Sequence, residues 1–262
     1  MDSPNTPGSD EYETPTDPAE RGRSLRRAAY LTAGAGIAHA VLFLLAAWLL
    51  SGVPGPKASD AEIVEYYSTG DSRRLILVGL YIMPFSGIAF LWFIVALRMW
   101  IAHSTRRISA LLSNVQLVSG ILFIGLFLAG AASQSVMAAS VEFSEAPVDP
   151  VVARQFPQFG SALLLVFALR MAAMFILTTS NIGRTSGVLP RWFVYVGFVV
   201  ALFLLLSATF SPLLALVFPV WVLTLCVFLI LGARKIPEDT VINPHSERRV
   251  GSVPAGPGEA RR

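Results

Sequence analysis

The sequence from Trp192 to Leu231 reads WFVYVGFVVALFLLLSATFSPLLALVFPVWVLTLCVFLIL, forty residues without a charged side chain. A helix needs about 20 such residues to cross the hydrocarbon core of a bilayer, so this run is too long for one span. Pro212 lies near its middle and disfavours a continuous helix, because proline lacks the backbone N–H and clashes with the preceding turn. The pattern predicts a tight helical hairpin with spans at 192–210 and 213–231. A broken, re-entrant segment would give the same pattern.

Four other long runs are apolar and contain no carboxylate. A charged side chain at the centre of a membrane helix costs about 2.5–3.5 kcal/mol on insertion scales, and all 17 carboxylates lie outside the apolar runs. Further spans are therefore predicted at 28–51, 75–97, 108–139 and 158–180. The third is longer than a bilayer requires, and we expect its outer end to project beyond the hydrocarbon. Residues 1–27 and 233–262 are polar and are expected to be disordered tails.

The composition supports this interpretation. The chain is 54% apolar and 14% charged, whereas soluble domains carry about 25% charged residues. A single cysteine, Cys226, excludes a disulfide framework and any multi-cysteine metal site. The basic residues flank apolar runs and form no stripe of the kind that binds nucleic acid. We therefore expect the lipid bilayer to be the main partner.

The distribution of Arg and Lys predicts the orientation, because cytoplasmic loops retain an excess of these residues. The side that holds the N-terminus carries Arg21, Arg23, Arg26, Arg27, Arg98, Arg106, Arg107, Arg184, Arg191, Arg234 and Lys235. The opposite side carries only Lys57, Arg73, Arg74 and Arg154. The sequence thus predicts an all-α, polytopic transmembrane helical bundle of six spans in the plasma membrane, with both termini cytoplasmic.

Two outer loops contain helix-start signals. Ser59 followed by Glu62 matches a capping box, and Gly70 is placed to end the short helix that would follow. Asp149 followed by Pro150 is typical of an N-cap and the first helical position. Two interpretations remain open. The two elements form a cap over the outer end of the bundle, or they are ordinary turns that orient the neighbouring spans.

One charge interrupts the apolar runs. Arg170 lies about 18 Å along the fourth span from Gln158, beyond easy reach of either interface, and no span contains a carboxylate to pair with it. His39 lies at similar depth, Gln116 and Ser119 lie on the third span, and Pro84 predicts a kink that frees a backbone carbonyl in the second.

Two hypotheses follow for these residues. In the first, Arg170 is structural and donates to carbonyls at the Pro84 kink and to amides such as that of Gln116. In the second, Arg170, His39, Gln116 and Ser119 bind an anionic group such as a carboxylate, phosphate or lipid headgroup. For His39 alone, a packed and hydrogen-bonded role is favoured over a ligand role.

The motifs of the common enzyme classes are absent from the sequence: there is no G-x-S-x-G elbow, P-loop, H-E-x-x-H or dinucleotide-binding glycine motif. His103 and His245 lie outside the predicted spans, so a bis-histidine haem is excluded. We expect no catalytic residue, no metal ligand, no cofactor and no enzymatic activity.

The run from Ser24 to Leu97 combines an Arg-flanked first span, the motif Asp60-Ala61-Glu62-Ile63, the pair Tyr66-Tyr67 and a proline-containing second span. This layout resembles that of uncharacterised six-span integral membrane proteins of high-GC Gram-positive (actinobacterial) bacteria. The resemblance implies a plasma-membrane location and no particular activity.

Two functions are expected from the sequence. The leading hypothesis is a non-enzymatic accessory or scaffold subunit that binds a membrane protein partner, and it predicts a closed bundle interior. The alternative is a small carrier or lipid-binding protein with an anionic ligand near Arg170, and it predicts a cavity that reaches the middle of the bundle.

Overall fold

The computed structural model describes residues 18–104, 109–207 and 211–234. Within these ranges every regular element is a helix, as the sequence predicts. The elements in order are α1 (Pro18–Leu50), α2 (Asp60–Ser68), α3 (Arg73–Leu77), η1 (Val78–Ile82), α4 (Met83–Ser104), α5 (Ala110–Ser144), α6 (Pro150–Ala162), η2 (Leu163–Ala168), α7 (Leu169–Ser186), α8 (Arg191–Leu206) and α9 (Pro212–Arg234). The two η elements are single π-helical segments inside longer helices.

Five helices are long and apolar enough to cross a membrane. They cover Arg26–Leu50, Arg73–Ala102, Ala110–Ser144, Pro150–Ser186 and Leu213–Arg234. The five agree in position with five of the six predicted spans, and the third is as long as the sequence indicates. The fourth is longer than predicted, because the Asp149 cap starts its helix at Pro150, well before residue 158.

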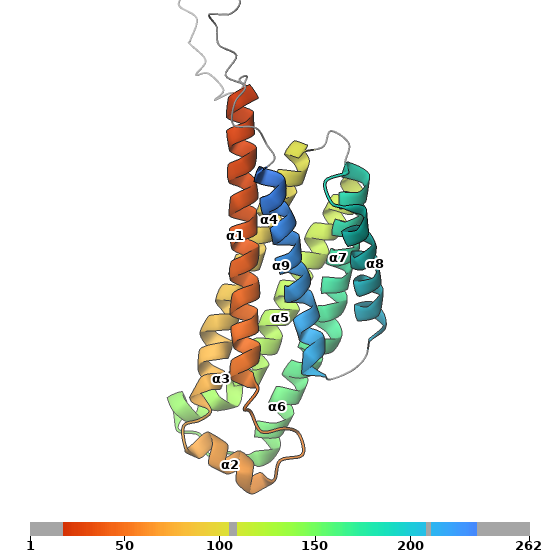
Figure 1. Cartoon of the computed structure of the whole chain (residues 1–262). Helices are drawn as coiled ribbons and strands as arrows, with labels where there is room; N and C mark the ends of the chain where they lie inside the picture. Colours follow the sequence, from red (N-terminus) through yellow and green to blue (C-terminus); the bar gives the residue numbers. More distant parts are fainter. Residues whose placement is uncertain (1–17, 105–108, 208–210, 235–262) are drawn as a thin grey trace, which may run out of the picture.

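The predicted span at 192–210 is not confirmed. α8 has 16 residues, which is about 24 Å of helix against a hydrocarbon core of about 30 Å. It stops at Leu206 instead of continuing to residue 210. The break between the two predicted spans of the hairpin is nevertheless present, since α8 ends before Ser207 and α9 begins at Pro212. In Figure 1 α1 begins and α9 ends at the same end of the bundle.

The N-terminal boundary also differs from the sequence interpretation. α1 begins at Pro18, within the segment 1–27 that was expected to be a disordered tail. Proline is favoured in the first turn of a helix, and the Ala, Glu, Arg and Leu residues that follow have high helix propensity, so the helix extends beyond its apolar run. The rest of the expected N-terminal tail and residues 235–262 of the C-terminal tail lie outside the described residues.

Phenylalanine rings fill the middle of the bundle. Phe90, Phe123, Phe175 and Phe218 come from four different helices and are fully buried, and Phe123 and Phe218 approach to 4.7 Å between ring centroids. Aromatic pairs in such tilted and edge-to-face arrangements add about 0.5–1.5 kcal/mol beyond the burial of their area. This cluster fixes how α4, α5, α7 and α9 pack against one another.

Glycines allow the closest helix contacts. A Cβ at Gly36 of α1 would lie 2.4 Å from Cys226 Sγ of α9 and 2.8 Å from a ring carbon of Phe93 in α4. A Cβ at Gly160 of α6 would lie 2.6 Å from the carbonyl oxygen of Gly130 in α5. Small residues at such positions let helix backbones approach closely where lipid supplies no hydrophobic driving force.

The two helix-start signals in the outer loops are confirmed. The Ser59 hydroxyl accepts from the Glu62 N–H while Glu62 accepts from the Ser59 N–H, which completes the capping box of α2. The Asp149 carboxylate accepts from the N–H groups of Val151 and Val152 at the start of α6. α2 lies across the end of the bundle in Figure 1, and its Tyr67 and Ile63 are buried against it. The cap interpretation therefore describes α2, whereas the second element is the start of the long helix that contains the fourth predicted span.

The helices differ in how far they extend toward this cap. α9 packs along α1 and contacts η2, but in Figure 1 its first turn lies well short of α2, and α1 ends at about the same level, whereas α6 continues to α2. α5 also reaches the cap, because its Met137 and Ala138 pack with Ile63 and Tyr67 of α2. Ala215, near that first turn, lines a cavity whose other walls come largely from these longer helices. The short reach of α9 thus divides the molecule into a closed half, where α9 packs on α1, and an open half next to α2.

Candidate functional site

A cavity of about 1040 Å³ occupies the open half of the bundle. Its walls come from α1 and the loop after it, from α2, from α5, and from the continuous helix formed by α6, η2 and α7. Along that last helix the lining runs from Ala153 to Leu169, which corresponds to about 24 Å of helix axis. Sites for drug-sized molecules hold about 300–1,000 Å³, so this cavity is large enough for a long ligand.

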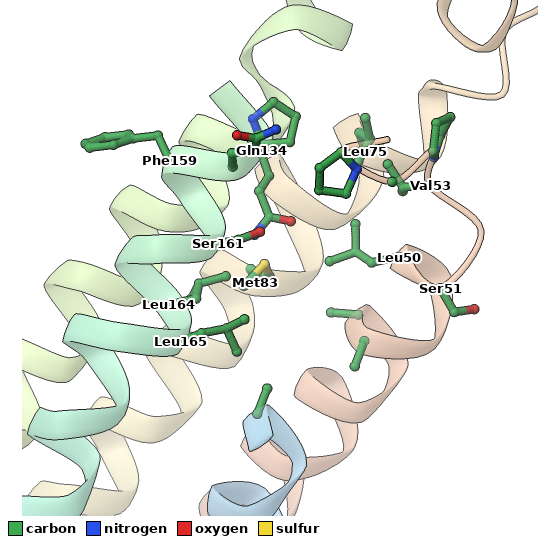
Figure 2. A pocket seen from close by; sticks show the side chains of 18 of the residues that line it. Leu50, Ser51, Val53, Leu75, Met83, Gln134, Phe159, Ser161, Leu164 and Leu165 are labelled. Carbon is green, nitrogen blue, oxygen red and sulfur yellow. The ribbon is translucent and has the colours of Figure 1, made fainter. Parts of the chain in front are cut away.

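The long walls of the cavity are apolar. Figure 2 shows Leu50 and Val53 on one side facing Leu164 and Leu165 on the other, with Met83 between them. Leu164 and Leu165 belong to η2, and Met83 follows directly on η1. Both π-helical segments therefore adjoin the cavity, in keeping with the frequent occurrence of such segments at functional sites.

Polar side chains gather at the end of the cavity next to the cap. They are Ser51, Tyr66, Tyr67, Gln134, Arg154, Gln155, Gln158 and Ser161. Burial raises the pKa of Tyr67 to about 12, and burial also raises the pKa of Tyr66. Both phenols therefore keep their protons and remain hydrogen-bond donors at neutral pH. The cavity thus has one end rich in donors and long apolar walls.

Arg154 of α6 forms hydrogen bonds that connect the polar end of the cavity to the cap helix α2. Its Nη2 donates to the carbonyl oxygen of Ala58 at 2.9 Å and to Asp60 Oδ1 at 2.7 Å. The two bonds connect α6 to the start of α2, across 94 residues of sequence for the pair with Asp60. Arg154 Nε is buried and has no acceptor.

Aromatic rings form the inner end of the cavity. Phe43, Phe123 and Phe127 line it, and the rings of Phe43 and Phe127 are stacked with centroids 5.4 Å apart. The centroids of these three rings, and those of Phe90 and Phe218, lie within 6.3 Å of the centroid of the His39 ring. His39 is fully buried and is not part of the cavity lining.

His39 joins α1 to α4. Its Nδ1 lies 3.0 Å from the carbonyl oxygen of Ser86, and the Ser86 hydroxyl lies 3.2 Å from the carbonyl oxygen of His39. The tautomer protonated at Nδ1 satisfies both contacts as a reciprocal pair of hydrogen bonds. His39 Nε2 has no partner. The favoured interpretation of His39 as a packed, hydrogen-bonded residue matches these contacts.

The structure does not bring the other candidate residues together with His39. Gln116 Nε2 donates to the Thr179 hydroxyl at 2.7 Å, and the Ser119 hydroxyl donates to the Gln116 carbonyl at 3.0 Å. Arg170 is half-buried and its Nη1 donates to the carbonyl of Val166 in its own helix, at 2.7 Å. Gln116 and Ser119 are therefore neighbours, while Arg170 and His39 each have separate partners.

The π-helical segments explain two of these arrangements. Just before Pro84, where the sequence predicts a kink, the helix contains η1, in which the Met83 N–H bonds to the carbonyl of Val78, five residues back. The wider turn immediately precedes the proline, whose ring would otherwise crowd the preceding turn. Val166, the acceptor for Arg170, lies inside η2. Arg170 therefore bonds to the backbone of its own helix at an irregular segment. It bonds neither to the carbonyls at Pro84 nor to the amide of Gln116, the partners that the structural hypothesis named.

The sequence interpretation missed Arg154 as a site residue. It counted this arginine only among the outer charges that set the orientation. One signal was present, because Arg154 lies shortly after the Asp149-Pro150 helix start and so belongs to the first turns of a helix next to the predicted cap. Among the described residues, no group of three or more His, Cys, Asp or Glu side chains is arranged to hold a metal ion.

No protein-family model, no curated protein and no solved structure matches this chain.

Proposed function

We propose that this protein is an integral plasma-membrane protein that binds a lipid-like amphiphile in the open half of its bundle, as a lipid-binding protein or small carrier. The observation that carries the proposal is the cavity of about 1040 Å³, which has long apolar walls and donors gathered at one end. An amphiphile has the same two parts, and burial of its tail is favourable by about 0.8 kcal/mol for each CH₂ group.

The cavity also favours this function over the scaffold hypothesis. A scaffold requires a closed interior, whereas the lining of this cavity reaches from the cap to Phe43, Phe127 and Ala215. The polar end lies beside α2, a helix outside the five candidate spans. A bound amphiphile would therefore have its head near the membrane surface and its tail at the depth of the acyl chains, as in a bilayer leaflet. With the termini in the cytoplasm, as the arginine distribution favours, this leaflet is the outer one.

A variant that fills the cavity tests the proposal. Ala47 of α1 lines the cavity, so Ala47→Trp places a large ring where the tail would lie. Leu45→Trp is the matched control, because Leu45 is in the same helix, is 39% exposed and is not part of the lining. Each protein is purified in mild detergent and washed, and the retained lipid is extracted and quantified by mass spectrometry.

We expect wild type and Leu45→Trp to retain about one molecule of a defined amphiphile per chain, and Ala47→Trp to retain at most a tenth of that amount, since the ring occupies the volume that the tail requires. Equal retention by all three proteins, with Ala47→Trp still folded, would overturn the proposal.

A further inference from the structure

Among the described residues, the cavity lining contains a single formally charged side chain, that of Arg154, and no carboxylate. All other polar groups in the lining are amides, hydroxyls and phenols. A lone cation beside an apolar cavity attracts negative charge more strongly than it would in water, because the surroundings screen it less. The charge of the lining therefore distinguishes between amphiphiles with different head groups.

Most of the hydrogen-bonding capacity of Arg154 is unused. A guanidinium has five N–H donors, and the two bonds to Ala58 and Asp60 both use Nη2. The N–H of Nε and both N–H groups of Nη1 have no acceptor within the described residues, and Nε is buried. Nη1 is not among the buried atoms without a partner, so an acceptor on a ligand can reach its two N–H groups.

Asp60 does not cancel the positive charge that the Arg154 guanidinium presents to the cavity. Its side chain is 70% exposed, whereas that of Arg154 is 26% exposed. Solvent and salt screen the exposed carboxylate, so the pair contributes little. Asp60 also engages only Nη2, which leaves the two N–H groups of Nη1 for a second oxygen ligand. Arginine presents its donors as a planar fork that suits carboxylate and phosphate oxygens.

We propose that the cavity selects an acidic amphiphile, and that the carboxylate or phosphate of its head accepts hydrogen bonds from Arg154 at the polar end. This inference rests on the proposed function, since it assigns the head group of the same ligand. It moves the expected anion site from Arg170 to Arg154. The amides of Gln158 and Gln155 and the hydroxyl of Ser161 provide further donors for the head.

Two probes with the same chain and different heads test this inference. Radiolabelled oleate and radiolabelled oleyl alcohol are bound separately to the washed, detergent-purified full-length protein, and dissociation constants are measured by equilibrium dialysis. Acetate, which has the carboxylate without the chain, is the competitor. The variants are Arg154→Gln, Arg154→Lys, Asp60→Asn and Ala47→Trp, with Leu45→Trp as the control for cavity filling.

We expect wild type to bind oleate at least about tenfold more tightly than oleyl alcohol, because a hydrogen bond between two charged groups is stronger than one to a neutral hydroxyl. Arg154→Gln should abolish this preference, because it weakens the binding of oleate much more than that of oleyl alcohol. Arg154→Lys should retain part of it, since the charge remains without the planar fork. Asp60→Asn should preserve or increase the preference, because it removes the competing carboxylate. Acetate should not displace oleate.

The outcomes separate this inference from the proposed function. If Arg154→Gln binds oleate as tightly as wild type, or if wild type binds both probes equally, the inference that Arg154 selects an acidic head group is wrong. The proposed function, binding of a lipid in the cavity, is not affected by that result. If acetate displaces oleate at equal concentration, the site binds a free anion and the amphiphile is wrong. If Ala47→Trp binds both probes as wild type does, the cavity is not the binding site and the proposed function fails.

Discussion

The closed and open halves of the bundle are built from the same kinds of residue, yet one is filled and the other is hollow. In the closed half α9 packs so tightly on α1 that a Cβ at Gly36 would meet Cys226 Sγ at 2.4 Å. In the open half α1 and the α6–η2 helix enclose about 1040 Å³. The lining there is also mostly apolar, so hydrophobicity alone does not distinguish the halves.

Helix length accounts for the difference. α5 has 35 residues and the continuous helix from α6 to α7 has 37, whereas α9 has 23 and α8 has 16. The longer helices extend to the cap, and the hairpin of α8 and α9 does not. A helix can only fill the space that its length reaches, so the space beyond Pro212 is left to side chains, to the cap and to a ligand.

The largest expected effect tests the packing of the closed half. Gly36→Val should lower the free energy of unfolding by about 3 kcal/mol, since overpacking costs about 1–3 kcal/mol and the new atoms meet both α4 and α9. Gly34→Val is the matched control, because a Cβ at Gly34 meets nothing within 4 Å and the change in helix propensity is the same. Unfolding in mixed detergent micelles, followed by circular dichroism, measures both. Equal stability of the two variants would show that the closed half is not tightly packed.

A smaller effect distinguishes the structural role of Arg170 from the ligand-binding role proposed for Arg154. Arg170→Met should lower stability in detergent by about 1.5–3 kcal/mol, because the Val166 carbonyl loses a charged donor. The oleate affinity of the folded fraction should stay within about twofold of wild type, since Arg170 is not part of the cavity lining. Arg184→Met, also in α7 but with an exposed arginine, is the control for loss of a positive charge. A tenfold loss of oleate affinity in Arg170→Met would return the anion site to the middle of the bundle.

The smallest effect concerns the cap. Hydrogen bonds from the Ser59 backbone and then from its hydroxyl hold the pKa of Glu62 below its ordinary value. A carboxyl whose pKa is lowered by folding stabilises the folded state above the ordinary glutamate pKa, and this contribution is lost as the pH falls through the lowered value. We therefore expect hydrogen-exchange protection factors of α2 to be constant near neutral pH and to fall in acid.

Glu62→Gln provides the control for this pH dependence, because a glutamine at the same position completes a capping box without titrating. Its α2 should show protection that does not change over the same acid range. Acid-dependent loss of α2 protection in Glu62→Gln equal to that in wild type would assign the pH dependence to another group.

Local signals explain which parts of the fold the sequence predicts well. The capping box at Ser59 and the cap at Asp149 depend on residues within three positions of each other, so both could be recognised before the structure was known. The five confirmed spans follow from runs of apolar residues, which need no knowledge of neighbours. The end of α8 at Leu206 was mispredicted, because the apolar run continues past it and composition does not mark where the helix stops.

The partners of the buried polar groups could not be predicted in the same way. Arg170 was expected to face Gln116 or the Pro84 kink, whereas it bonds to Val166, and Gln116 bonds to Thr179. The depth of a residue in a span follows from its position in the sequence. Its direction around the helix depends on which helices pack beside it, and the π-helical turn of η2 just before Arg170 alters that direction.

The sequence by itself determined that the chain forms apolar helices of spanning length, where the outer helices begin, and that the final apolar run is broken near Pro212, because each of these depends on apolar length or on short-range hydrogen bonds. Only the tertiary structure decided that α9 stops short of the cap, that a cavity opens beside it, and that Arg154 instead of Arg170 lies at that cavity. These features depend on the relative reach and rotation of helices that are distant in sequence.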